Sequence, residues 1–179
     1  MCLLQVIRIH YTTINVTAEQ IREMGRGLHL FDLTDCDITG IEDGAFNSLT
    51  DLNSLKLSEN YIRKIGNKTF SSPRLQVLYL DGNGLEVIED DAFAQLPKLQ
   101  KLHLQHNKLE KMSFTLPSSL NVLDISHNNI LSITTDLNKV RFGSFKFSSK
   151  YFKCFFQSDV KLTDVVSWHV TSCCLTAGT

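Results

Sequence analysis

Histidine, aspartate and serine, the side chains of a hydrolytic triad, occur at His103, Asp124 and Ser126, and two further histidines follow at His106 and His127. In such a triad the serine attacks a carbonyl, the histidine takes its proton and the aspartate orients the histidine. Clustered histidines can instead bind zinc or change charge near neutral pH. Which chemistry is available depends on the elements that carry these residues.

The central part of the chain repeats one frame, Leu-x-x-Leu-x-Leu-x-x-Asn-x-Leu, starting at Leu52, Leu75, Leu99 and Leu120, with Ile at some of the apolar positions. Weaker copies start at Leu4, Leu28 and Phe142, which gives roughly seven units. A frame of about two dozen residues predicts a solenoid, in which each unit stacks a short strand on its neighbour and atypical units cap the ends. The expected fold class is α/β, with a parallel concave sheet and an irregular or 3-10 convex side.

Two buried columns are expected to hold the units together. The first is an asparagine ladder at the turn after each strand, where amides satisfy backbone groups of adjacent turns, and Cys36 takes this position in the second unit. Its members are Asn60, Asn83, Asn107 and Asn128. The second is a phenylalanine spine through Phe46, Phe70 and Phe93, which we expect to break in the unit that begins at Leu99.

Side chains between and after the inward leucines point out of the concave sheet, so equivalent positions of successive units form rows. These rows contain an acidic zone near the N-terminal end and a Tyr/His/Asp zone further on. The candidate ligand-binding residues are Asp32, Asp35, Lys56, Glu59, Tyr79, Asp81, His103, His106, Asp124 and His127. One interpretation is a protein-binding hot spot centred on Tyr79 and His103, another is a metal site or pH switch, and a third is a solvated polar face without a role.

Catalysis is not expected from these residues. Gly-x-Ser-x-Gly, Gly-x-x-x-x-Gly-Lys and His-Glu-x-x-His are all absent from the sequence. A flat open sheet also fails to exclude water, which weakens the electrostatic stabilisation that an active site needs. We therefore expect a non-enzymatic protein without cofactor or resident metal.

Composition restricts the classes of partner. The net charge is −1 and no basic run occurs, so nucleic acid is not an expected partner. Charged or polar residues interrupt every apolar stretch before it reaches the about 20 residues that a membrane span requires. The expected partner is a protein ligand or a microbial surface component.

Cysteines and sequons bear on location. The disulfide candidates are Cys2, Cys36, Cys154, Cys173 and Cys174, an odd number whose connectivity spacing does not decide. Asn15-Val16-Thr17 and Asn67-Lys68-Thr69 match the acceptor sequence for N-glycosylation, although a chain of this composition carries about two such matches by chance.

The repeated frame, with Ala-Phe at Ala45-Phe46 and Ala92-Phe93, resembles the typical subfamily of extracellular leucine-rich repeats over about Leu28 to Ile133. This subfamily occurs in Toll-like receptors, lamprey lymphocyte receptors and insect immune proteins. The resemblance implies secretion and recognition of innate-immune type. The paired Cys173-Cys174 is similar to the insect branch, whose members often form disulfide-linked dimers, although no heptads follow it here.

The resulting division is a degenerate N-terminal repeat or cap at 1–27, regular repeats at 28–133, and an aromatic last repeat with a cysteine-containing cap at 134–179. Two functions stay open: a secreted recognition module, and an intracellular or extracellular-matrix scaffold without a sensing role. Oxidised cysteines in the C-terminal part favour the former, and free thiols favour an intracellular scaffold.

Overall fold

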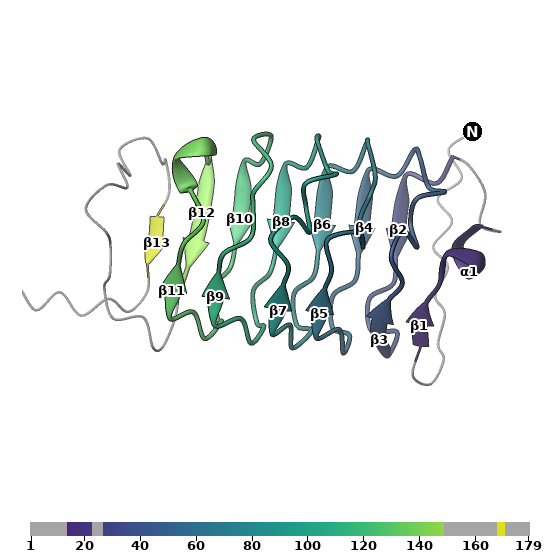
Figure 1. The fold of residues 1–179 in the computed structure, drawn as a ribbon, viewed down its shortest axis with the longest axis horizontal. Coiled ribbons are helices and arrows are strands. Elements are labelled where there is room, and N and C mark those ends of the chain that lie inside the picture. Colours follow the sequence, from purple (N-terminus) through teal and green to yellow (C-terminus); the bar gives the residue numbers. More distant parts are fainter. Residues whose placement is uncertain (1–13, 23–26, 149–167, 171–179) are drawn as a thin grey trace, which may run out of the picture.

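The computed structural model describes residues 14–22, 27–148 and 168–170, and shows a solenoid of stacked units (Figure 1). One short strand from each successive unit joins a seven-stranded parallel sheet, here called the concave sheet, in the order β13-β12-β10-β8-β6-β4-β2. Its strands are β2 (Leu30–Asp32), β4 (Ser54–Lys56), β6 (Val77–Tyr79), β8 (Lys101–His103), β10 (Val122–Asp124), β12 (Ser144–Phe147) and β13 (Trp168–Val170). The expected solenoid fold is confirmed.

A second set of short strands runs along the opposite edge of the solenoid (Figure 1). They form three parallel pairs, β1-β3, β5-β7 and β9-β11. Their bounds are β1 (Ile14–Val16), β3 (Ile38–Ile41), β5 (Lys64–Ile65), β7 (Val87–Ile88), β9 (Lys111–Met112) and β11 (Ser132–Ile133). Among the described residues, helix is confined to α1 (Ala18–Arg22) and the 3-10 turn η1 (Leu137–Lys139), so the other connections are irregular.

The asparagine ladder forms as the sequence predicts. Asn107 is buried; its Oδ1 accepts hydrogen bonds from the backbone N–H groups of Asn83 and Leu85 at 3.1 and 2.8 Å. Its Nδ2 donates to the carbonyls of Leu80 and Leu104 at 2.9 and 3.0 Å. Each amide therefore ties its own turn to the turn of the preceding unit, where the backbone groups would otherwise lack partners.

The phenylalanine spine is longer than the sequence predicts. Phe46, Phe70 and Phe93 stack nearly in parallel, with centroids 6.1 and 6.4 Å apart. The expected break after Phe93 is wrong, because Phe114 is buried and meets Phe93 edge to face at 5.6 Å. The ring enters from a different position in its unit, and Phe31 caps the other end of the spine in the same edge-on manner.

The ends of the chain are less fully described. Cys2, Cys154, Cys173 and Cys174 lie outside the described residues, so pairing that involves them stays a prediction. Cys36 is buried at the ladder position, and its backbone N–H donates to Asn60 Oδ1 at 3.0 Å. The strand β13, which continues the concave sheet beside β12, was not expected from the sequence.

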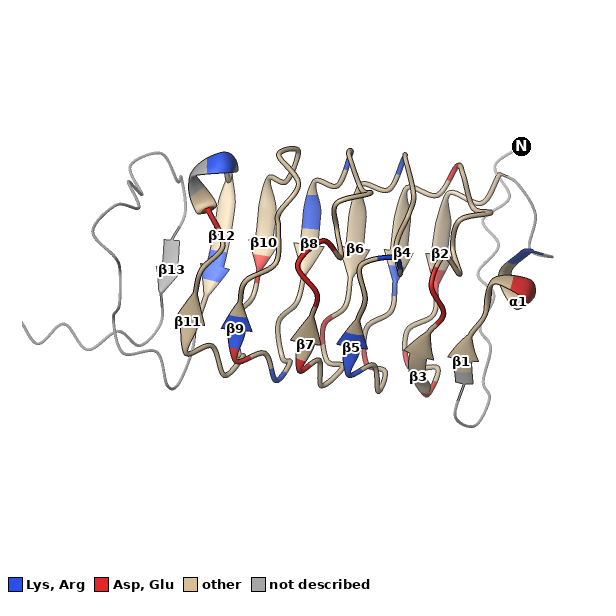
Figure 2. Ribbon diagram, in the orientation of Figure 1, with Lys and Arg blue, Asp and Glu red and all other residues tan. Residues whose placement is uncertain are grey.

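Charged residues of both signs are distributed along the whole solenoid (Figure 2). No helix within the described ranges is long and apolar enough to cross a membrane.

Candidate functional site

The outward-facing residues of the concave sheet form continuous rows because successive strands pair in register. Lys56 of β4 is aligned with Tyr79 of β6, Tyr79 with His103 of β8, and His103 with Asp124 of β10. The central row therefore reads Asp32, Lys56, Tyr79, His103, Asp124 and Lys146.

Tyr79 and His103 form a stacked pair at the middle of this row. Their ring centroids are 4.6 Å apart and their planes differ by 7°. Burial lowers the pKa of the His103 imidazole below its ordinary value of 6.5, and the nearby carboxylates of Asp124 and Asp81 offset this only in part. The His103 ring is therefore uncharged at neutral pH, and the pair presents a half-buried aromatic surface.

Ion pairs flank the aromatic pair on both sides. Lys56 Nζ lies 3.0 Å from Asp32 Oδ2, and Lys146 Nζ lies 3.4 Å from Asp124 Oδ2. Burial raises the pKa of Asp32, but hydrogen bonds from Thr34 and Lys56 outweigh it and hold the pKa below its ordinary value. The row thus pairs its six side chains two by two, with the neutral pair in the centre.

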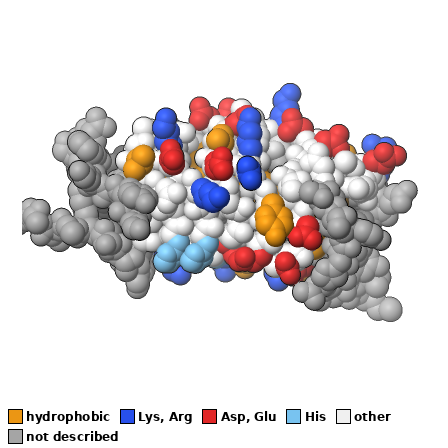
Figure 3. Space-filling model, turned by 90° about the horizontal axis from the view of Figure 1, so that it is seen from below, with side chains coloured by type: hydrophobic (Ala, Val, Ile, Leu, Met, Phe, Trp, Pro, Cys, Tyr) orange, Lys and Arg blue, Asp and Glu red, His pale blue; other side chains and the backbone are white. Residues whose placement is uncertain are grey.

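A second outward row follows the strand ends, just before the asparagine ladder. Its members have left-handed backbone conformations; they are Asp35, Glu59, Gly82, His106 and His127. The His106 and His127 rings stack 4.4 Å apart at 4°, so the contact expected from the repeat register is confirmed. Figure 3 views the solenoid from below, and histidine side chains gather there beside one another, apart from the acidic ones.

The sequence reasoning missed one row of the same sheet. The first residue of each strand also faces outward, because it lies two positions before the central row. This row reads Leu30, Ser54, Val77, Lys101, Val122 and Ser144. The two-residue alternation that identified the central row would have located these positions, which place Val77 and Val122 on the same outward face as the aromatic pair.

The geometry does not assemble a catalytic triad. The Ser126 hydroxyl donates to Asp124 Oδ1 at 2.6 Å, so the serine is bonded to the acid rather than to a histidine base. Asp124 Oδ2 is paired with Lys146. Within the described part of the chain, no group of three or more His, Cys, Asp or Glu side chains is placed to hold a metal ion.

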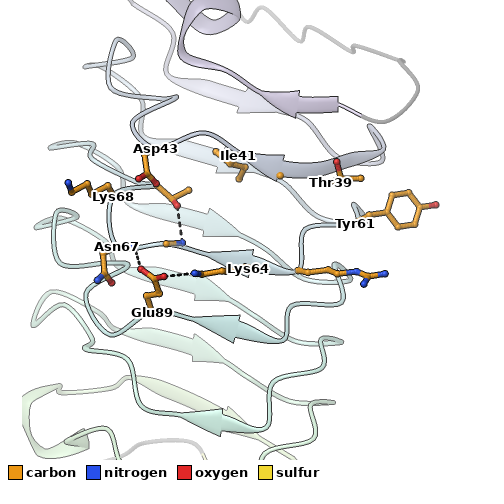
Figure 4. A pocket seen from close by; sticks show the side chains of 12 residues that line it. Thr39, Ile41, Asp43, Tyr61, Lys64, Asn67, Lys68 and Glu89 are labelled. Carbon is orange, nitrogen blue, oxygen red and sulfur yellow. Dashed lines mark hydrogen bonds and ion pairs between the residues drawn. The ribbon is translucent and has the colours of Figure 1, made fainter.

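A second surface feature is an open cleft of about 960 Å³ between β3 and β5, on the edge opposite the concave sheet (Figure 4). Tyr61 lies at one end, and Asn67 and Lys68 lie at the other; Arg63 also lines the cleft. Lys64 and Glu89, which both line the cleft, form an ion pair of 2.5 Å. Cations and carboxylates are mixed here, and the lining residues contain no stacked aromatic pair like that of the concave sheet.

Comparison with known proteins bears on what such a sheet does. The family model for the leucine rich repeat matches residues 26–83 and 73–130, together more than half of the chain. The chain is 38% identical to mimecan of Coturnix japonica over 111 residues, which is 61% of this chain and 37% of mimecan. It is 35% identical to podocan of Mus musculus over 115 residues, which is 62% of this chain and 18% of podocan.

These relatives are secreted proteins of the extracellular matrix, and the expected extracellular location is confirmed. The chain spans little more than a third of the mimecan that it matches. Its fold is similar to that of TLR13 in a crystal structure of a TLR13-ssRNA13 complex, with a TM-score of 0.77 over 93% of this chain and 24% of TLR13. The identity there is 22%, so this likeness concerns the fold alone.

Proposed function

Because the chain belongs to the leucine-rich repeat family, we propose that it is a non-enzymatic extracellular module that binds a protein partner on its concave sheet. The observation that carries this proposal is the central row, with a stacked aromatic pair, Tyr79 and His103, between two ion pairs. Aromatic groups in the middle of an interface, surrounded by polar contacts that exclude water, supply most of the binding energy in many protein complexes.

The shape of the sheet supports a protein partner over a small molecule. Small ligands bind in concave pockets that bury most of their surface, whereas rows of side chains along a sheet offer area without depth. The strands of the sheet repeat about every 4.8 Å, so an extended or flat protein surface can contact several units at once.

The similarity to known relatives favours binding of a partner in the extracellular matrix. Mimecan and podocan are matrix proteins with 35 to 38% identity to this chain, while the likeness to TLR13 is confined to the fold. We therefore favour an extracellular-matrix scaffold. Innate-immune recognition, binding of a microbial component and a disulfide-linked dimer stay predictions.

The two sequons fit this arrangement. Asn15 belongs to β1 and Asn67 follows β5, both side chains are exposed, and both strands lie on the edge opposite the concave sheet. Asn67 Oδ1 accepts a hydrogen bond from the backbone N–H of Asp91 at 2.9 Å. A glycan at either asparagine would leave the concave sheet open to a partner.

The proposal is tested by affinity capture from an extracellular-matrix extract. The immobilised chain is compared with the double variant Tyr79→Ser/His103→Ser and with Tyr61→Ser, whose 61% exposed ring lies on the opposite edge. We expect the same proteins on the wild type and on Tyr61→Ser, and their loss from the double variant. Equal capture by all three proteins would contradict a concave binding site.

A further inference from the structure

Two register partners in the central row of the concave sheet turn away from each other. Lys56 and Tyr79 are aligned on the neighbouring strands β4 and β6. Lys56 reaches toward Asp32 on β2, and Tyr79 stacks on His103 of β8. β2 and β8 lie on opposite sides of this strand pair, and among the described residues no hydrogen bond, ion pair or ring contact joins Lys56 to Tyr79; we call this boundary between β4 and β6 the seam.

One face of the Tyr79 ring borders this seam. His103 stacks on the other face of the ring, and the Lys56 ammonium is held at Asp32 on the far side of β4. At the end of the seam, Ser58 Oγ donates to Asp81 Oδ1 at 2.8 Å, which positions the Asp81 carboxylate two residues after Tyr79 along the chain. The seam therefore has an aromatic wall and a positioned carboxylate.

The charge around the seam is negative. The outward rows of the first three concave strands and their ends contain Asp32, Asp35, Glu59 and Asp81 against the single ammonium of Lys56. Lys56 is neutralised by Asp32, whereas Asp81 makes no ion pair among the described residues. Glu59 leans over Gly82, so closely that a side chain at Gly82 would collide with its carboxylate.

We propose that the seam between β4 and β6 binds an arginine side chain of the partner, with its guanidinium on the face of Tyr79 that is turned toward β4 and its N–H groups donating to the Asp81 carboxylate. This assignment rests on the proposed function and names the chemistry that the concave sheet recognises. A guanidinium is planar, stacks on aromatic rings and matches a carboxylate with two parallel hydrogen bonds, which a lysine ammonium does not.

The neighbouring imidazole is compatible with a bound cation. Burial keeps His103 in its neutral form at neutral pH, so it does not repel a guanidinium on the far side of Tyr79. The charged groups that act on His103 are Asp124, Asp81, Lys146 and Lys101.

The test uses three capped pentapeptides in which a central arginine, lysine or citrulline is flanked by glycines. Citrulline has the shape of arginine without its charge. Each peptide is titrated into the full chain at low ionic strength and followed by NMR. We expect the arginine peptide to shift the Tyr79 ring and Asp81 amide signals, the lysine peptide to bind more weakly, and the citrulline peptide to leave these signals unchanged.

Two variants of equal net charge separate the seam from a general charge effect. Asp81→Asn is expected to lower the affinity for the arginine peptide by up to about fivefold, which is the effect of losing an exposed ion pair. Asp91→Asn removes an exposed carboxylate on the opposite edge and is expected to leave the affinity unchanged. Replacement of Tyr79 by Leu is expected to weaken binding two- to fivefold, roughly the worth of an exposed cation–π contact.

The assignment is overturned if the arginine and citrulline peptides bind alike, or if both aspartate variants behave as the wild type. The Tyr79→Ser/His103→Ser variant can lose its partners in the capture experiment while Asp81→Asn leaves peptide binding unchanged. In that case the protein-binding function stands and the arginine seam is wrong. If the Tyr79→Ser/His103→Ser variant keeps its partners and the Asp81→Asn variant keeps its affinity for the arginine peptide, both the protein-binding function and the arginine seam are contradicted.

Discussion

The Tyr79 and His103 rings stack in parallel at 4.6 Å, although each has a charged register partner on its other side. Those charged neighbours, Lys56 and Asp124, are held by Asp32 and Lys146. The aromatic pair consequently stands as a neutral centre between two closed ion pairs. This arrangement concentrates apolar contact where a partner would cover the sheet most completely.

Acidification should destabilise the folded chain partly through His103. Its pKa is below 6.5 in the folded protein and returns to about 6.5 in the unfolded chain, which therefore binds more protons between the two values. The stability from the neutral ring is fully present above pH about 6.5 and is lost as the pH falls through the folded pKa. Chemical unfolding of wild type and His103→Gln across this range should show a weaker acid dependence for the variant. Parallel curves would show that His103 titrates alike in both states.

Replacement of Asn107 by Ala should lower the free energy of unfolding of the solenoid. The substitution removes partners from two buried N–H groups and at least two carbonyls, at a cost of roughly 3 kcal/mol or more. Asn129, one residue beyond the ladder position Asn128, is exposed, and Asn129→Ala should change the unfolding free energy by less than about 0.5 kcal/mol. Denaturant unfolding measures both, and a similar effect of the two substitutions would remove the ladder as the explanation.

Gly82→Ala should cost about 1 kcal/mol because the backbone there has φ of 68°, a left-handed conformation that a Cβ disfavours. The contact with Glu59 adds little, since the carboxylate ends a flexible side chain that can move aside. Gly66 is a matched control, because its φ is not left-handed and a Cβ there meets its nearest neighbours at 3.5 Å, an ordinary contact. Thermal unfolding of the two variants compares them, and an unchanged Gly82→Ala would mean that this turn relaxes without strain.

Much of this molecule follows from its repeated frame. Leucine spacing fixes which side chains point inward, so the concave strands, the asparagine ladder and the cross-strand neighbours His106 and His127 could be predicted. Phe114 could not be assigned to the spine, because it reaches the core from a shifted position in an irregular unit, and burial rather than spacing decides such cases.

The choice of side-chain partners within the central row could likewise not be predicted from the sequence. Asp32, Lys56 and Tyr79 were recognised as neighbours, but each side chain has two possible partners. The choice depends on rotamers and on contacts such as the hydrogen bond of 2.7 Å from Thr34 Oγ1 to Asp32. The seam beside Tyr79 is a consequence of that choice, so only the structure shows it. β13 was missed because its segment lacks the leucine frame.

Site-specific photocrosslinking measures most directly whether a partner occupies the concave sheet. A benzophenone side chain is placed at Tyr79 in one protein and at Tyr61, on the opposite edge, in another, and both are irradiated in a matrix extract. We expect a discrete protein adduct from position 79, suppressed by excess unlabelled chain, and none from position 61. Adducts from position 61 alone, or the same adducts from both positions, would contradict partner binding on the concave sheet.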